Sequence, residues 1–155
     1  MALITISGFP ASGKSTRAHH ISRFLSQRIT EHGYSGPIAK VAVLSDHSLG
    51  LTRDCYNDSK SEKPARGALF TAVQRQLSPD TILIVDSLNY IKGFRYQMYC
   101  AAREMKLRTC TVYVIASPDQ SREWNSTRDA NNAYLQTTQV VSLFITAPLI
   151  SPIVS

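Results

Sequence analysis

The sequence predicts an α/β fold, a mainly parallel sheet with helices on both faces, and two observations lead to this prediction. Short apolar runs alternate with segments whose apolar residues recur at helical spacing, so the order along the chain is β-α-β-α-β-α-β. The apolar runs are almost uninterrupted, as expected for strands covered on both faces and joined by right-handed crossovers. The 155 residues suffice for one such domain, 1–155, and are too few for two.

The first half of the chain contains two predicted strands and two predicted helices. Residues 2–6 form an apolar, β-branched strand, and residues 7–15 form the loop that leads into the first helix. The first helix has its apolar residues on one face, at Ala18, Ile21 and Leu25. A second strand covers 38–44, and the polar stretch 47–63 is predicted to be a long surface loop because it has little periodicity. The helix that follows has apolar residues at Ala65, Ala68, Leu69, Ala72, Val73 and Leu77.

The second half repeats the alternation. Residues 81–85 are a continuous Thr-Ile-Leu-Ile-Val strand, and residues 87–93 form a loop. The spacing then predicts a helix with apolar residues at Phe94, Met98, Ala101, Ala102 and Met105. A fourth strand covers 109–116 and stops at Ser-Pro-Asp, 117–119.

Composition and charge restrict the surroundings of the protein. No segment combines the length and apolarity of a membrane span, and no leader peptide precedes the first strand, so we expect a monomer in the cytoplasm or nucleus with no membrane partner. The net charge of +6 favours a polyanionic partner such as a nucleic acid. A basic surface without such a partner is the alternative.

The strongest chemical signal is the run Gly8-Phe9-Pro10-Ala11-Ser12-Gly13-Lys14-Ser15, which fits G-x-x-x-x-G-K-[ST] at every specified position. Gly8 and Gly13 permit backbone angles and a close approach that a Cβ would obstruct, so that successive N–H groups converge on phosphate oxygens. Lys14 can reach the β- and γ-phosphates, Ser15 can ligate magnesium, and Thr16 contacts the α-phosphate. The sequence therefore predicts a P-loop NTPase of the kinase-like subgroup that binds ATP and Mg²⁺.

Two carboxylates follow predicted strands. Asp86 ends a buried run that we expect beside the first strand, which makes it the natural metal-binding carboxylate. Asp46 follows the second strand, where it can orient an attacking hydroxyl or water, or hold a metal-bound water. Capping of a helix or turn is the alternative for both residues.

Arginines are candidates for contacts with the phosphate groups. Arg66 stands at the start of a predicted helix, where it can clamp the γ-phosphate or an acceptor, although a solvated helix face explains it almost as well. Arg122 and Arg128 lie in the polar segment after the fourth strand, where lids supply transition-state arginines. We take Arg66 and Arg128 as the catalytic candidates, beside Lys14 and Asp46.

Several motifs together resemble a known family. The run at 86–96, Asp-Ser-Leu-Asn-Tyr-Ile-Lys-Gly-Phe-Arg-Tyr, is more discriminating than the P-loop at 8–15. Glu-Lys-x-x-Arg at 62–66, Tyr-Cys-Ala-Ala-Arg at 99–103 and Trp-Asn-x-x-Arg at 124–128 extend the match. The sequence is similar to the Elongator-associated killer-toxin-insensitivity ATPases, which are related to L-seryl-tRNA(Sec) kinase.

The resemblance implies an accessory factor that binds ATP and tRNA and supports the Elongator complex in modifying the wobble uridine of tRNA. It assigns nucleotide and magnesium binding to Lys14, Ser15 and Asp86, and Asp46 matches the acidic position that serves catalysis in the related kinase. The match ends before the tail at 139–145, so we expect the family's C-terminal tRNA-binding domain to be absent, tRNA affinity to be reduced, and a fifth strand to be in doubt.

Lys92 and Arg95 are candidate RNA contacts, because Tyr90 and Tyr96 place aromatic faces beside their charges. Packing against the nucleotide-binding loop is the alternative.

Three functions share the predicted site. The first is a tRNA-dependent ATPase that regulates Elongator, the second is a kinase for a small molecule or an RNA hydroxyl, and the third is a nucleotide-gated scaffold with negligible turnover. Residues that position phosphate cannot distinguish the acceptors.

Overall fold

Parallel strands form one sheet in the order β2-β3-β1-β4 within the part of the chain that the computed structural model describes, residues 1–31, 33–129, 133–135 and 138. The strands are β1 (Ala2–Gly8), β2 (Lys40–Ser45), β3 (Thr81–Asp86) and β4 (Arg108–Val114). Every neighbouring pair is parallel, as the alternation of strands and helices predicted.

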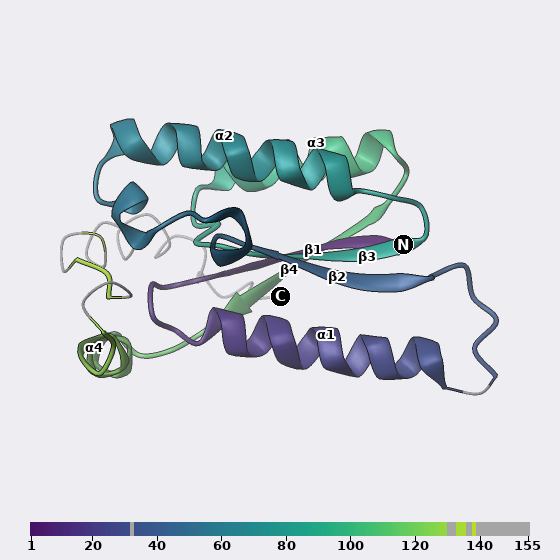
Figure 1. Ribbon diagram of the computed structural model, residues 1–155, viewed down its shortest axis with the longest axis horizontal. Coiled ribbons are helices and arrows are strands. Elements are labelled where there is room, and N and C mark those ends of the chain that lie inside the picture. The colour runs from purple at the N-terminus through teal and green to yellow at the C-terminus, as the bar shows by residue number, and fades with distance from the viewer. Residues whose placement is uncertain (32, 130–132, 136–137, 139–155) are drawn as a thin grey trace, which may run out of the picture.

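Helices cover both faces of the sheet. Figure 1 shows α1 (Lys14–Thr30) on one face and α2 (Ser59–Gln76) with α3 (Lys92–Glu104) on the other. The short helix α4 (Pro118–Ser126) lies beyond the carboxyl end of the sheet. The predicted P-loop fold, a parallel sheet between two helical layers, is confirmed.

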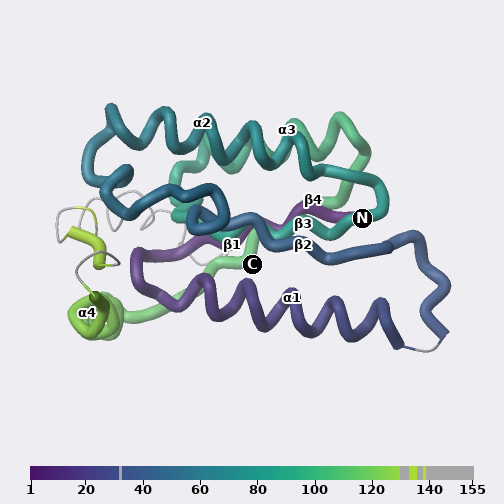
Figure 2. Tube along the Cα trace, in the orientation of Figure 1, coloured from purple at the N-terminus to yellow at the C-terminus, as the bar shows by residue number. Residues whose placement is uncertain are grey.

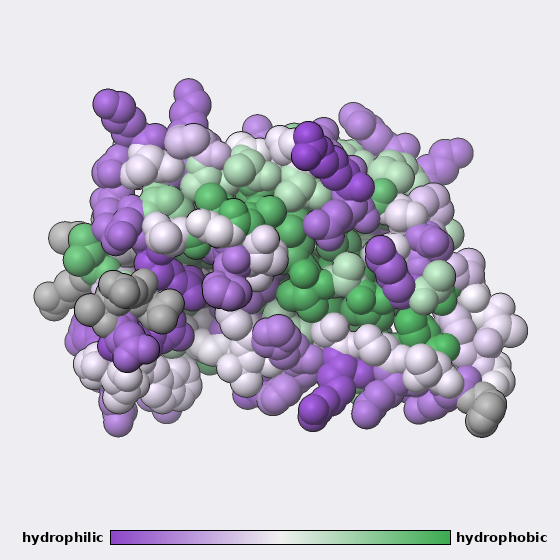
Figure 3. Space-filling model, viewed as in Figure 1, coloured by the Kyte–Doolittle hydropathy of each residue, from purple (hydrophilic) through white to green (hydrophobic). Residues whose placement is uncertain are grey.

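Hydrophobic side chains fill the space between these layers. Leu69 and Val73 of α2 pack with Leu83 of β3 and Met98 of α3 in the larger core. A second core lies under α1, around Ala18. Figure 3 shows a hydrophobic band between the polar outer sides of the two helical layers, as expected for a sheet enclosed by amphipathic helices. Within the described residues, no helix is long and apolar enough to cross a bilayer.

The prediction of a surface loop over 47–63 is wrong. This stretch contains two 3-10 helices, η1 (His47–Leu49) and η2 (Arg53–Tyr56), and α2 already begins at Ser59. Local hydrogen bonds order it, since the Asp58 side chain accepts from two amides in the first turn of α2. Polar caps of this kind leave no apolar periodicity, which is why the pattern did not reveal them.

Other boundaries shift by a few residues. Helix α3 begins at Lys92, before Phe94, and the polar segment after β4 contains α4. A reciprocal capping box between Ser117 and Gln120 begins this helix. The tail at 139–145 lies outside the described residues.

The parallel sheet brings the predicted motifs to one edge. Asp86, the last residue of β3, pairs in register with Ile6 of β1 and Ser45 of β2. The loop after β1 and Asp46 after β2 therefore meet Asp86 at the carboxyl ends of their strands, which is where open α/β sheets bind ligands. Figure 2 shows the connection from β2 to α2 passing over this same end of the molecule.

Candidate nucleotide-binding site

The loop between β1 and α1 encloses a buried lysine. Lys14 is the first residue of α1 and only 7% exposed, and its Nζ donates hydrogen bonds to the carbonyls of Phe9 (2.5 Å) and Gly8 (3.2 Å). Burial lowers the pKa of Lys14 to about 7, and the nearby Asp86 carboxylate opposes this shift. A bound anion would offset the cost of burying this ammonium group.

The two glycines of the motif have different tasks. Gly13 precedes α1 with φ +84°, a conformation that disfavours residues with a Cβ, and so lets the chain turn into the helix. Gly8 has φ +142°, and a Cβ there would lie 2.4 Å from the Val114 carbonyl oxygen. Gly8 therefore permits close contact with β4, while Gly13 shapes the N-terminus of α1, where free amides attract phosphate.

Two carboxylates face this loop from neighbouring strands. Asp86 and Asp46 are both buried, each 6% exposed. Burial raises the pKa of Asp46, and the hydroxyls of Ser87 and Tyr56 reduce this effect. Within the described part of the chain, Asp46 Oδ1 is a buried oxygen without a hydrogen-bond partner. An incoming donor or cation would satisfy it.

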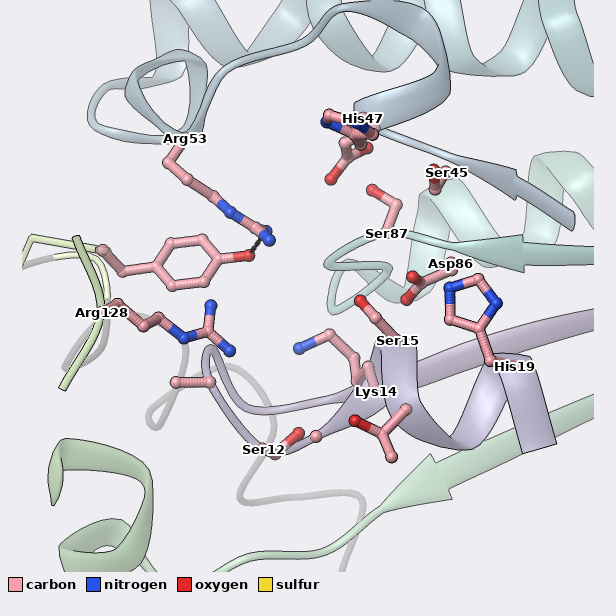
Figure 4. A pocket seen from close by; sticks show the side chains of 15 residues that line it. Ser12, Lys14, Ser15, His19, Ser45, His47, Arg53, Asp86, Ser87 and Arg128 are labelled. Atoms are coloured by element: carbon pink, nitrogen blue, oxygen red, sulfur yellow. Dashed lines mark hydrogen bonds between the residues drawn. The ribbon is translucent and has the colours of Figure 1, made fainter. Parts of the chain in front are cut away.

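These groups line one cleft, shown in Figure 4. Figure 4 shows Arg53 and Arg128 on one side and Asp86, Ser15 and Ser87 on the other, with the Lys14 side chain extending between the two groups. The full lining is Ala11, Ser12, Gly13, Lys14, Ser15, Thr16, His19, Ser45, Asp46, His47, Arg53, Asp86, Ser87, Arg128 and Tyr134. The cleft therefore has a cationic part for a polyanion and an acidic part for a cation.

Most of the residues predicted for the site meet in this cleft. It is lined by residues 11–16 of the loop, by Asp46 and Asp86, and by Arg128. Gly8, Phe9 and Pro10 are buried, and the first two hold Lys14 through their carbonyls. Where two arginines had been equivalent, the structure places Arg128 at the cleft, whereas exposed Arg122 pairs with Asp119.

Three predicted residues lie elsewhere. Arg66 pairs with buried Glu62 (Nε to Oε1 3.6 Å) and lines a separate small cavity, so the structure does not bring it to the cleft. Arg95 donates to the carbonyls of Asn89 (2.7 Å) and Tyr90 (2.8 Å), which supports the structural alternative for this residue. Lys92 is exposed at the start of α3 and stays a candidate for RNA contact.

Sequence reasoning missed three residues that line the cleft, Arg53, Tyr134 and His19. Arg53 lies in the stretch misread as a loop, and Tyr134 follows the last family motif, so neither had a periodic or motif signal.

The cleft fits ATP and magnesium. A buried ammonium and two arginines match a triphosphate, and the unpartnered Asp46 oxygen with Asp86 and the Ser15 hydroxyl matches a hard divalent cation. No cluster of three His, Cys, Asp or Glu side chains that could hold a metal occurs among the described residues. Proteins commonly hold magnesium through one or two carboxylates and the phosphates of the substrate, and Asp46 and Asp86 line the cleft as two such carboxylates.

The fold and the cleft define the class of protein as a P-loop protein with the nucleotide-binding phosphotransferase fold. A model of the family described as "Chromatin associated protein KTI12" matches residues 1–144, and the chain belongs to this family. The resemblance inferred from the motifs is thereby confirmed.

Individual relatives agree with this assignment. Protein kti12 of Schizosaccharomyces pombe is 43% identical over 129 residues, which cover 83% of this chain and 46% of the relative. The Xenopus laevis KTI12 homolog is 42% identical over 137 residues, 88% of this chain and 46% of that protein. The chain thus spans about half the length of the curated relatives it matches.

Solved structures agree as well. The crystal structure of Chaetomium thermophilum Kti12 in complex with ADP-AlF3 superposes with a TM-score of 0.80 at 35% identity, covering 92% of this chain and 79% of the other. The APS kinase CysC of Mycobacterium tuberculosis in complex with AMPPNP and APS has a TM-score of 0.60 at 13% identity, covering 97% of this chain and 98% of that one. At this identity the kinase shows the shared fold alone.

Proposed function

We propose that this chain binds Mg-ATP and hydrolyses it. The observation that carries the proposal is the meeting of Lys14, Ser15, Asp46 and Asp86 in one cleft at the N-terminus of α1. The homologous structure from Chaetomium thermophilum contains ADP-AlF3, which supports a nucleotide in the corresponding site of this chain.

The side chains of the cleft have separate tasks in this proposal. Lys14 and the amides at the start of α1 bind the β- and γ-phosphates. Ser15 and Asp86 hold magnesium, with Asp46 beside them. When bound, magnesium neutralises charge on the phosphate oxygens. Arg128 lies at the cationic side, where it can contact the same phosphates.

Asp46 acts on the attacking water. Its buried carboxylate can accept a hydrogen bond from water and orient it toward the γ-phosphorus. The water oxygen forms a bond to phosphorus while the bond to the β–γ bridging oxygen breaks, and its electron pair stays on ADP. One water proton passes to Asp46 and then to solvent, which leaves ADP and inorganic phosphate.

We further propose that this activity serves the Elongator complex in tRNA wobble-uridine modification and that tRNA stimulates turnover. Membership of the KTI12 family and the net charge of +6 support this proposal. A kinase that transfers phosphate to a hydroxyl of a small molecule or RNA is the second candidate. The similarity to kinase folds is consistent with either acceptor.

The decisive experiment follows the γ-phosphate of labelled Mg-ATP with and without tRNA. We expect label in inorganic phosphate alone, released faster with tRNA. Label retained on an RNA or a metabolite identifies a kinase, and binding without turnover identifies a nucleotide-gated scaffold. Stimulation by an unrelated polyanion as strong as that by tRNA would contradict the RNA-specific part of the proposal.

A further inference from the structure

Arg53 and Tyr134 come from distant parts of the chain and meet at the cleft. Arg53 lies in η2 and Tyr134 follows α4, yet the guanidinium Cζ lies 4.5 Å from the tyrosine ring centroid. Arg53 Nη1 also donates a hydrogen bond to the Tyr134 hydroxyl, and Figure 4 shows Arg53 reaching into the cleft. One ring thus holds the guanidinium through its π face and its hydroxyl.

Tyr134 is itself held firmly by α4. The Asn125 side chain donates to the Tyr134 carbonyl (2.9 Å) and accepts from the Tyr134 amide (2.9 Å). Asn125 belongs to the last turn of α4, and Tyr134 is only 6% exposed. Side chains locked by packing and by a second layer of hydrogen bonds position functional groups accurately. The series Asn125, Tyr134 and Arg53 therefore links α4 to the cleft.

Charge indicates what Arg53 faces. The positive charge of Arg53 contributes to lowering the pKa of Lys14 and opposes the burial-induced rise in the pKa of Asp46, so its guanidinium acts on both. None of the ion pairs in the described part of the chain includes Arg53 or Arg128. Arg53, Arg128 and Lys14 repel each other, the carboxylates of Asp86 and Asp46 offset this repulsion only in part, and a bound phosphate would offset it further. Nη1 is the Arg53 donor that bonds to a described residue, the Tyr134 hydroxyl, and the guanidinium has further N–H groups that can bind phosphate oxygens.

We propose that Arg53 contacts the transferred phosphate and that Tyr134 and Asn125 are positioning residues that hold its guanidinium there. The inference rests on the proposed function, because it concerns the same cleft. As the bond to the β–γ bridging oxygen breaks, negative charge grows on the phosphate oxygens, and a fixed guanidinium stabilises that charge more than the ground state. Through Asn125 and Tyr134, helix α4 thereby contributes to the site by holding Arg53.

Steady-state kinetics of the 155-residue chain test the assignment. We expect Arg53→Ala to lower kcat about 100-fold, with KM for Mg-ATP changed less than about fivefold. Tyr134→Ala should lower kcat almost as much as Arg53→Ala does, whereas Tyr134→Phe, which keeps the ring and loses only the hydroxyl acceptor, should lower kcat less, by about tenfold. The kcat of Asn125→Ala should lie between those of Tyr134→Ala and Tyr134→Phe.

The control variants are Leu135→Ala, an exposed neighbour of Tyr134, and Arg75→Ala, an exposed arginine of α2. Both should keep the wild-type kcat. Wild-type kcat in Tyr134→Ala would overturn the positioning role. Equal losses of kcat and melting temperature in Tyr134→Phe and Tyr134→Ala would overturn it as well, since they would indicate a structural role alone.

A binding experiment separates this inference from the proposed function. Trp124 is the only tryptophan of the chain and precedes Asn125, so its fluorescence can report on α4 during titration with ADP, with and without aluminium fluoride. Arg53→Ala should bind ADP like the wild type and ADP with aluminium fluoride about 100-fold more weakly. Equal affinity of both proteins for ADP with aluminium fluoride would overturn the role of Arg53. A wild type that binds neither would contradict the proposed function itself.

Discussion

Single buried charges define the chemistry of the cleft. Lys14 is almost inaccessible, and its nearest hydrogen-bond partners are backbone carbonyls. A buried ammonium without a carboxylate bonded to it is costly for the free protein and favourable once phosphate binds. The same reasoning applies to the negative charge of Asp46, whose buried Oδ1 would gain a partner when a hydrogen-bond donor or a cation binds.

Replacement of Lys14 separates function from stability. We expect Lys14→Ala to abolish ATP turnover, by more than about 100-fold, because it removes the phosphate clamp. The melting temperature without nucleotide should not fall, because a buried charge is relieved. Phosphate release and thermal unfolding of the same preparation check both outcomes. A variant that turned over normally would disprove the role of Lys14.

Replacement of Asp46 tests the chemical step. Asp46→Asn keeps the shape of the side chain but cannot accept a proton, so kcat should fall about 10²- to 10⁴-fold. Mg-ATP affinity, measured by equilibrium titration, should change far less than kcat. Normal turnover in this variant would disprove the catalytic role of Asp46.

Gly8 offers a test of backbone packing. In Gly8→Ala the new methyl group would meet the Val114 carbonyl, and we expect a loss of roughly 1–3 kcal/mol in the free energy of unfolding. The matched control is Gly67→Ala in α2, where no atom lies within 4 Å of the new Cβ. This substitution should raise the free energy of unfolding by about 0.5–1 kcal/mol. Urea unfolding of both variants gives the comparison. Equal effects at the two positions would contradict the close contact with β4.

At the scale of elements, α4 stands apart from the layered core. It lies beyond the end of the sheet (Figure 1), and only Ser121 of its residues is buried. Hydrogen bonds at the helix termini therefore contribute much of its stability. The capping box at Ser117 and Gln120 begins the helix, and Asn125 in its last turn holds Tyr134. The local capping box thus stabilises this helix, and the hydrogen bond from Asn125 to Tyr134 connects the helix to the cleft.

The capping box has a measurable consequence. Ser117→Ala should destabilise α4 by about 1 kcal/mol, because the amide of Gln120 loses its acceptor. Amide hydrogen exchange in α4 should then be about fivefold faster while α1 keeps its protection. Unchanged exchange in α4 would mean that tertiary contacts, and not the cap, determine its stability.

At the scale of the whole molecule, charge distinguishes candidate surfaces for tRNA. Arg95 is unsuitable for charge reversal, because its guanidinium holds the backbone of the loop after Asp86. Lys92 is exposed, so reversal of its charge can be tested without disturbing the backbone contacts that Arg95 makes. Lys92→Glu should weaken tRNA binding and reduce the slope of log affinity against log salt by about 1 if it contacts phosphate.

The control for this experiment is Lys60→Glu, which reverses an exposed charge in the first turn of α2. Filter binding at several salt concentrations, with ATP affinity measured in parallel, gives the comparison. Equal effects of the two reversals would show a general response to net charge, and intact affinity in Lys92→Glu would remove this residue from the RNA surface.

The layered fold and the centre of the site were predictable from local patterns in the sequence. Continuous apolar strands such as 81–85 reveal burial on both faces, and the P-loop spacing reveals a phosphate site, because both signals are local. Asp46 and Asp86 were predictable because parallel strands bring their carboxyl ends to one edge, a rule that needs no coordinates.

Which arginines reach the cleft depends on long-range packing that local patterns do not reveal. Arg66 was a reasonable candidate, but the turn of α2 pairs it with Glu62, whereas Arg53 enters from a stretch without periodicity. Tyr134 and Arg53 are separated by 81 positions, and the hydrogen bonds of Tyr134 to Asn125 of α4 help to place the ring beside Arg53. Such a contact leaves no pattern in either segment, since it forms only when the folded chain brings the two segments together.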